Sequence, residues 1–170
     1  MRIKGKAWKY GDDIDTDVIY PGKYLVSFDP AEAGKHALEG LEADFYKKIA
    51  PGDILVVGKN FGSGSAREQA AMALRAAGIG AVVAESFARS FYRNALNLCL
   101  PVVELPGIQS ATEERDELEV DLDEGLVRNL TKQKDYHFPP LPAFIMEILK
   151  VGGAAYYKAK ARREAARSAP

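Results

Sequence analysis

The sequence predicts a single α/β domain in which parallel strands carry packed helices. Three short apolar runs, at residues 53–57, 80–84 and 100–105, are typical of strands buried on both faces. The two segments between them, residues 66–77 and 87–98, have the composition and periodicity of helices. This alternation of strands and helices indicates parallel pairing with helices covering the sheet.

The flanking segments predict additional elements, including a peripheral hairpin. Residues 2–9 are expected to form a first strand, and residues 31–49 short helical turns. Residues 112–124 hold eight acidic residues interleaved with apolar ones at period two, which predicts an exposed edge strand. A turn then leads into a hairpin partner at residues 126–129, and a final helix is expected over residues 143–151.

We expect one domain over residues 1–153, followed by a basic tail over residues 154–170 that is helical or frayed. A total of 170 residues is long enough for one compact core and short for two. The net charge of −1 supplies no basic field for a nucleic acid, and no apolar run reaches the length of a membrane span. Residues 1–6 lack the apolar core of a signal peptide, so we expect a cytoplasmic protein.

The segment at residues 60–69, with the sequence NFGSGSAREQ, joins the first internal strand to the first long helix. Gly62 and Gly64 permit positive φ angles and let another group approach the backbone closely. Free N–H groups and the positive end of the helix dipole would then meet at one point, which favours an anion. Arg67 adds a guanidinium that can grip a carboxylate at two points.

Known glycine-loop motifs do not fit this segment. It has no phosphate-binding G-x-x-x-x-G-K, and Arg67 occupies the third glycine position of a dinucleotide-binding loop. A hydrolase nucleophile elbow centred on Ser65 would also need glycine at position 67. Two interpretations stay open on spacing alone: an anion site, or a loop in which Ser65 and Glu68 form a capping box and Arg67 pairs with a surface acid.

A second polar segment, at residues 11–17, crowds four aspartates into seven positions. Three of them have the spacing of a calcium loop, but Val18 and Tyr24 replace the required glycine and glutamate. An Asx-rich turn, in which the side chains bond their own backbone, is the simplest interpretation from the residues themselves.

Three blocks, at residues 11–21, 60–69 and 86–95, occur in one order that is specific as a set. Together they resemble the small subunits of the 3-isopropylmalate dehydratases, within the aconitase family, and the likeness extends to about Gly153. The resemblance implies a swivelling β/β/α domain of the aconitase C-terminal type. It also implies a hydro-lyase subunit of leucine biosynthesis that interconverts 2-isopropylmalate and 3-isopropylmalate through isopropylmaleate.

The resemblance assigns roles to individual residues. Ser65 would be the catalytic base, acting as an alkoxide whose charge the loop N–H groups and Arg67 stabilise. Asp17 would support this region as a second catalytic residue. The other residues expected to bind substrate are Thr16, Gly64 and Ala66. Ala66 replaces a second serine that is common in the family, and Gln69 a common histidine, so binding of a related substrate such as 2,3-dimethylmalate stays open.

The loop at residues 21–28 matches the one that contacts the substrate's distinguishing side group in this family, through Tyr24, Leu25 and Val26. Burying an isopropyl group against two aliphatic side chains would contribute about 1–3 kcal/mol, whereas a third carboxylate would lose hydration without a partner. Isopropylmalate is therefore favoured over homocitrate or citrate, and a homoaconitase small subunit stays open as the alternative. Lys23 is the one cation whose long side chain could reach back into the site.

Cys99 is the only cysteine, so this chain alone can form neither a disulfide nor an iron–sulfur cluster. With His36 and His137 as the only histidines, no metal site is expected either. The resemblance therefore implies a [4Fe–4S] cluster on a separate large subunit. Two further alternatives stay open: a noncatalytic anion-binding module, and a scaffold that only pairs with another chain. A homo-oligomer of the isolated chain also stays open.

Two arginines of the third block also have two interpretations. Arg89 and Arg93 fall on the polar positions of the second long helix. They belong either to a solvated helix face or to a surface that binds anions or the partner subunit.

Overall fold

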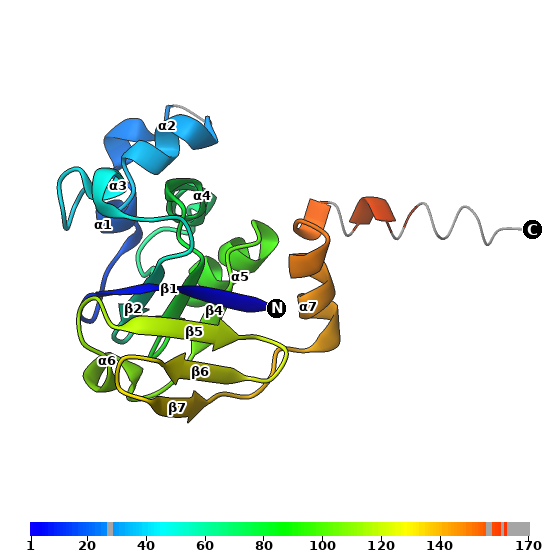
Figure 1. Cartoon of the computed structure of the whole chain (residues 1–170). Helices are drawn as coiled ribbons and strands as arrows, with labels where there is room; N and C mark the ends of the chain where they lie inside the picture. The colour runs from blue at the N-terminus through cyan, green and yellow to red at the C-terminus, as the bar shows by residue number, and fades with distance from the viewer. Residues whose placement is uncertain (27–28, 156–157, 161, 163–170) are drawn as a thin grey trace, which may run out of the picture.

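A computed structural model of the chain describes residues 1–26, 29–155, 158–160 and 162. Within these residues one mixed sheet has the strand order β4-β3-β2-β1-β5-β6-β7 (Figure 1). Its strands are β1 (Arg2–Lys9), β2 (Ile54–Val57), β3 (Ala81–Ala84), β4 (Val102–Glu104), β5 (Glu117–Asp121), β6 (Leu126–Asn129) and β7 (Lys134–His137). The helices are α1 (Thr16–Ile19), the 3-10 turn η1 (Gly22–Tyr24), α2 (Pro30–Lys35), α3 (Phe45–Lys48), α4 (Glu68–Ala77), α5 (Arg89–Asn97), α6 (Ile108–Ala111) and α7 (Ala143–Lys150).

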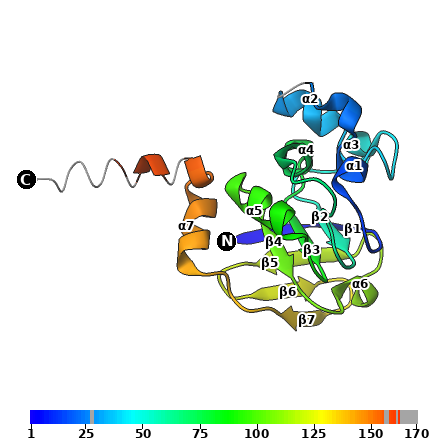
Figure 2. The ribbon, with the colours of Figure 1, turned by 180° about the vertical axis from the view of Figure 1, so that it is seen from behind.

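The half of the sheet formed by β1 to β4 is parallel, as predicted. Every residue of β2 and β3 is buried, which explains their continuous apolar sequences. In Figures 1 and 2, α4 and α5 lie on one side of this half and α6 on the other. The α/β class with packed helices and a peripheral hairpin is therefore confirmed.

The other half is antiparallel, and here one prediction is wrong. Residues 112–124 were expected to supply an exposed edge strand, but β5 pairs with β1 on one side and β6 on the other. The edges of the sheet are β4 and β7. The acidic side chains of β5 are tolerated inside the sheet because cations on the neighbouring strands neutralise them.

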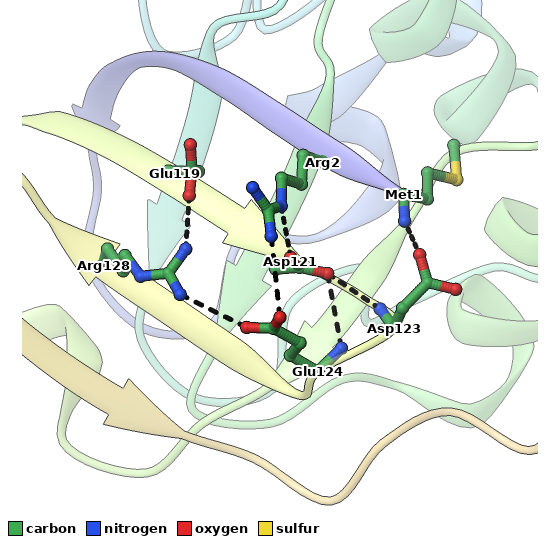
Figure 3. Close-up of polar contacts among 7 residues, drawn as sticks. All are labelled: Met1, Arg2, Glu119, Asp121, Asp123, Glu124 and Arg128. Carbon is green, nitrogen blue, oxygen red and sulfur yellow. Dashed lines mark hydrogen bonds and ion pairs between the residues drawn. The ribbon is translucent and has the colours of Figure 1, made fainter.

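Cross-strand ion pairs provide that neutralisation (Figure 3). Arg2 Nε donates to Asp121 Oδ2 at 2.6 Å, and Arg128 Nη1 donates to Glu119 Oε1 at 2.5 Å. Arg128 also reaches Glu124 beyond the hairpin turn, at 3.2 Å. The predicted hairpin is confirmed, since β5 and β6 pair in register across it.

The start of α4 differs from the prediction. The helix begins at Glu68 rather than at residue 66, and its N-cap Arg67 makes no side-chain capping hydrogen bond. The backbone N–H of Arg67 instead donates to the carbonyl of Ser65 at 2.8 Å, which holds these residues in a tight turn outside the helix. The capping box of Ser65 and Glu68 is therefore wrong, whereas the cap at Gly78 is confirmed by its left-handed φ of 105°.

The C-terminal segment is described only in part. Residues 154–155, 158–160 and 162 have helical backbone, and Lys160 Nζ donates to Glu147 Oε1 at 2.6 Å. The predicted nature of the rest of the tail falls outside the described residues. None of the helices in the described part of the chain is long and apolar enough to cross a membrane.

Candidate active site

The glycine loop after β2 and the aspartate-rich segment after β1 lie side by side. The N–H of Gly62 donates to the carbonyl of Ile14 at 2.8 Å, and the N–H of Thr16 donates to the carbonyl of Ser63 at 2.9 Å. A parallel bridge joins Asp15 to Ser63 between these bonds. The backbone thus brings two of the three motif blocks together at the carboxyl ends of the parallel strands, where open α/β sheets bind ligands.

Gly62 fixes the path of this loop. Its φ is +77°, and a Cβ atom on it would lie 2.2 Å from Cγ of Phe91 on α5. Phe61 packs edge-on against Phe91 with ring centroids 5.0 Å apart. The loop is therefore held against α5 by aromatic packing, and a side chain at position 62 would push it away.

The aspartates of residues 11–17 make different kinds of contact. Asp12 accepts the N–H of Lys59 at 2.7 Å, and Asp13 accepts the side-chain amide of Asn60 at 2.8 Å. Asp15 accepts the N–H of Val18 at 2.9 Å and so caps α1. The predicted Asx turn is correct for Asp15, while the preceding two aspartates bind the neighbouring loop instead.

Asp17 is the aspartate that meets the predicted cation. Its carboxylate forms an ion pair with the guanidinium of Arg67. Gly22 lies directly over the pair: a Cβ atom there would sit 3.3 Å from Asp17 Oδ1 and 3.5 Å from Arg67 Nη1. The pair fixes the direction of Arg67, whose further N–H groups can still bind an anion.

The residues at the tip of the glycine loop face solvent. Gly64, Ser65 and Ala66 are all exposed, so the Ser65 hydroxyl is open to a ligand or a partner surface. Thr16 lies beneath them, 1% exposed, and a Cβ atom on Gly64 would sit 3.4 Å from its Oγ1. Within the described part of the chain Thr16 Oγ1 has no hydrogen-bond partner. Thr16 therefore supports the loop from below.

The residues of the loop at positions 21–28, which is predicted to contact the substrate's side group, make different contacts. Tyr24 stacks on His36 with ring centroids 3.6 Å apart, and its hydroxyl donates to Glu39 Oε1 at 2.8 Å. Lys23 also donates to Glu39, at 3.0 Å, so its ammonium group already has an anionic partner. The structure thus places Tyr24 and Lys23 against the α2 side of the loop.

The two aliphatic residues of this loop differ in exposure. Leu25 packs partly against the core, and its Cδ1 would lie 4.0 Å from a Cβ on Gly22, beside the Asp17–Arg67 pair. Val26 is 91% exposed. The remaining two residues of the predicted loop, Ser27 and Phe28, lie outside the described residues.

Glu39 anchors this loop and was not found by sequence reasoning. Partial burial opposes its ionisation, but hydrogen bonds from Lys23, His36 and Tyr24 outweigh that effect and lower the pKa of Glu39 to about 2. The spacing of His36 and Glu39 was visible in the sequence. Their link to Tyr24 was not, because it depends on the fold of the intervening residues.

The described residues also bear on whether this chain could hold a cluster or metal ion. Among the described residues, no group of three or more His, Cys, Asp or Glu side chains could hold one. The thiol of Cys99 contacts the carbonyls of Ile148 and Leu149 on α7, and burial raises its pKa. The single thiol therefore packs between helices, and these residues do not fit an iron–sulfur cluster.

Comparison with known proteins gives consistent matches. The aconitase C-terminal domain family matches residues 13–106. A 3-isopropylmalate dehydratase small subunit of Pyrobaculum calidifontis is 57% identical over 157 residues, which are 92% of this chain and 97% of that protein. An isopropylmalate/citramalate isomerase small subunit of Methanocaldococcus jannaschii is 50% identical over 162 residues, covering 95% and 96% of the two chains.

A solved structure agrees with these relatives. The crystal structure of a 3-isopropylmalate dehydratase from Methanocaldococcus jannaschii superposes with a TM-score of 0.93 at 41% identity, covering 99% of this chain and all of that one. Sequence and fold therefore coincide over nearly the whole length. The chain belongs to the aconitase C-terminal domain family and, within it, to the small subunits of 3-isopropylmalate dehydratase.

Proposed function

We propose that this chain works with a large subunit to interconvert 2-isopropylmalate and 3-isopropylmalate by removal and return of water. The observation that carries the proposal is the exposed Ser65, on a glycine loop beside the Asp17–Arg67 pair. Relatives that share this chain's length are named for the same reaction. The product of dehydration would be isopropylmaleate, in the pathway to leucine.

In the proposed dehydration, Ser65 Oγ takes the proton from the carbon next to a carboxylate. The C–H electron pair forms the double bond as hydroxide leaves from the adjacent carbon, and rehydration reverses these steps. A serine hydroxyl is too weak an acid to act this way unless nearby positive charge stabilises its alkoxide. Arg67, fixed by Asp17, and the loop N–H groups supply that stabilisation.

The same residues would hold the substrate. Arg67 can bind one carboxylate with the N–H groups that Asp17 leaves free, while Gly64 lets the substrate approach the backbone. Thr16 would keep the loop at the correct height. Departure of hydroxide needs a Lewis acid, which a [4Fe–4S] cluster on the large subunit would supply.

The side group of the substrate would face Leu25. An apolar surface favours an alkyl group and gives no partner to a third carboxylate, so homocitrate is disfavoured. A citramalate-type substrate is the second candidate, because one relative is named for both reactions. The alanine at position 66 leaves room for such a change in how the carboxylate is held.

Anaerobic reconstitution tests this function. The chain is co-expressed with candidate cluster-bearing large subunits, and each pair is assayed with isopropylmalate, citramalate, homocitrate and 2,3-dimethylmalate. We expect turnover of isopropylmalate, and slower turnover of the other three acids. Absence of turnover with every partner would favour a noncatalytic anion-binding module or a scaffold.

A further inference from the structure

Two adjoining pockets form a groove along the edge strand β4, which β3 separates from β2 and its glycine loop. The first, of about 230 Å³, is lined by Phe87, Arg89, Tyr92, Arg93 and Glu104. The second, of about 340 Å³, shares Tyr92 and Glu104 with it and continues along residues 138–142. We call these two pockets together the β4 groove.

The groove begins next to the candidate active site. A parallel bridge joins Phe61, which begins the glycine loop, to Phe87. The N–H of Ala88 donates to the carbonyl of Phe61 at 2.9 Å. Arg89 then opens α5, which lies against β4 (Figure 2). The groove therefore adjoins the residue from which the glycine loop starts.

One end of the groove carries two cations against one carboxylate, that of Glu104, which accepts the N–H of Phe87 at 3.3 Å. Arg89 and Arg93 are both exposed, and neither forms an ion pair with any described residue, whereas Arg2, Arg67 and Arg128 each do. They are four residues apart on one helix, where like charges repel. An anion between them would relieve this repulsion.

The other end of the groove is apolar and rich in proline. Residues 138–142 have the sequence FPPLP, with Phe138 buried and Leu141 half-buried. Three prolines give this wall few N–H groups to offer a ligand, so it favours apolar contact. A ligand that fits both ends is extended, with a carboxylate at one end and an apolar group at the other.

We propose that the β4 groove docks an extended segment of the large subunit, with a carboxylate side chain between Arg89 and Arg93 and an apolar side chain on the proline wall. This inference rests on the proposed function, which requires a large subunit over the Ser65 loop. Charge excludes the chain's own tail as the occupant, since residues 154–170 hold five basic residues and one acidic residue.

The association of the two subunits, measured without substrate, tests this docking. The double variant Arg89→Ala/Arg93→Ala should raise the Kd for the large subunit about tenfold or more, and weaken its dependence on salt. Arg75→Ala is the matched control, because Arg75 is another exposed helix arginine without an ion pair to the described residues. It should leave the Kd unchanged.

The outcomes separate the inference from its alternatives. An unchanged Kd in a double variant that melts like the parent chain overturns the docking. An unchanged Kd with a raised KM would assign the arginines to substrate binding and also overturns the docking. If the parent chain forms a homodimer and the double variant does not, the groove binds a second copy, which overturns the docking as well. If the double variant fails to fold, Arg93→Gln alone should raise the Kd by several-fold, and an unchanged Kd would overturn the docking.

Failure of the proposed function has a different signature. Association is measured without turnover. A pair of subunits that is inactive, but whose association depends on Arg89 and Arg93, would contradict the proposed reaction and support the docking groove. An active pair whose Kd does not change when both arginines are replaced would contradict the docking groove and support the proposed reaction.

Discussion

The two halves of the sheet differ in where their charged side chains lie and in whether these are paired. In the antiparallel half, carboxylates of β5 pair with cations of β1 and β6, so most of its charge is satisfied within the sheet. In the parallel half, β2 and β3 are apolar and fully buried, and the charged side chains of the candidate site lie in the loops beyond the carboxyl ends of the strands. There, Arg67 has one partner and the arginines of the β4 groove have none among the described residues.

The comparison shows that density of charge does not indicate function in this chain. The eight acidic residues of the segment at 112–124 serve the sheet, whereas a single aspartate, Asp17, meets the cation of the candidate site. Mutations in the two halves should therefore separate. Substitutions in the loops at the carboxyl ends of the parallel strands should alter activity, and substitutions in the antiparallel half should alter stability.

Arg67→Ala should have the largest effect among these substitutions. Loss of the guanidinium removes both the grip on a carboxylate and the charge beside Ser65, so kcat/KM of the reconstituted enzyme should fall by about 10²–10³. Arg67→Lys should recover only part of it, because an ammonium binds at one point. Arg128→Ala, in the antiparallel half, is the control; an equal loss of activity there would contradict the separation.

Asp121→Asn should lower stability and leave kcat unchanged. Asp121 is 2% exposed and accepts from Arg2 Nε at 2.6 Å and from the N–H of Asp123 at 3.1 Å. Loss of its charge should lower the free energy of unfolding by about 1–3 kcal/mol. Urea denaturation measures this value, and a drop in kcat without a drop in stability would contradict the division.

Acid should destabilise the antiparallel half and the segment after α2 through carboxylates whose pKa is depressed in the folded state. Hydrogen bonds, chiefly from Arg2, outweigh burial and lower the pKa of Asp121, and those around Glu39 lower its pKa to about 2. Such groups stabilise the fold at pH values above the unfolded pKa, about 4. That stability is lost as the pH falls through the folded pKa.

The free energy of unfolding measured from pH 6 to pH 2 should therefore decrease below about pH 4. Glu39→Gln should make this decrease shallower, since one depressed carboxylate is gone. Glu85→Gln, at a half-buried glutamate with no side-chain hydrogen bond to the described residues, is the control. An unchanged slope for Glu39→Gln would show that Glu39 does not contribute to the acid sensitivity.

Leu25→Ala should have the smallest effect of this series, a change in substrate preference. Loss of apolar surface beside the Asp17–Arg67 pair should reduce kcat/KM for isopropylmalate relative to citramalate by about tenfold. Val26→Ala is the comparison, because Val26 is 91% exposed in the free chain. A larger shift for Val26 would mean that the loop repacks against the large subunit.

The sequence predicted the parallel half well, because each of its buried strands and helices has a local pattern. It failed for β5, where alternation correctly gave a strand but could not show that Arg2, far away in the sequence, would neutralise it inside the sheet. Local patterns also placed the start of α4 two residues early. The turn that closes between Ser65 and Arg67 is set by tertiary contacts of the glycine loop.

The candidate site was predictable only in part, because its motifs are local in the sequence whereas its other contacts depend on the tertiary fold. The glycine loop and Asp17 were found from their motifs, and the structure brings Asp17 and Arg67 together. The hydrogen bonds of Tyr24 and Lys23 to Glu39 could not be predicted, because they join residues 15 and 16 positions apart through the tertiary fold.

The central claim is that Ser65 performs the proton transfer, and one measurement addresses it directly. The rate of isopropylmaleate hydration by the reconstituted enzyme is compared for the parent chain, Ser65→Ala and Ser63→Ala, at saturating large subunit. We predict a loss of about 10²–10⁴ for Ser65→Ala and nearly full activity for Ser63→Ala, whose loop position is two residues away. Near-parental hydration by Ser65→Ala would contradict the account.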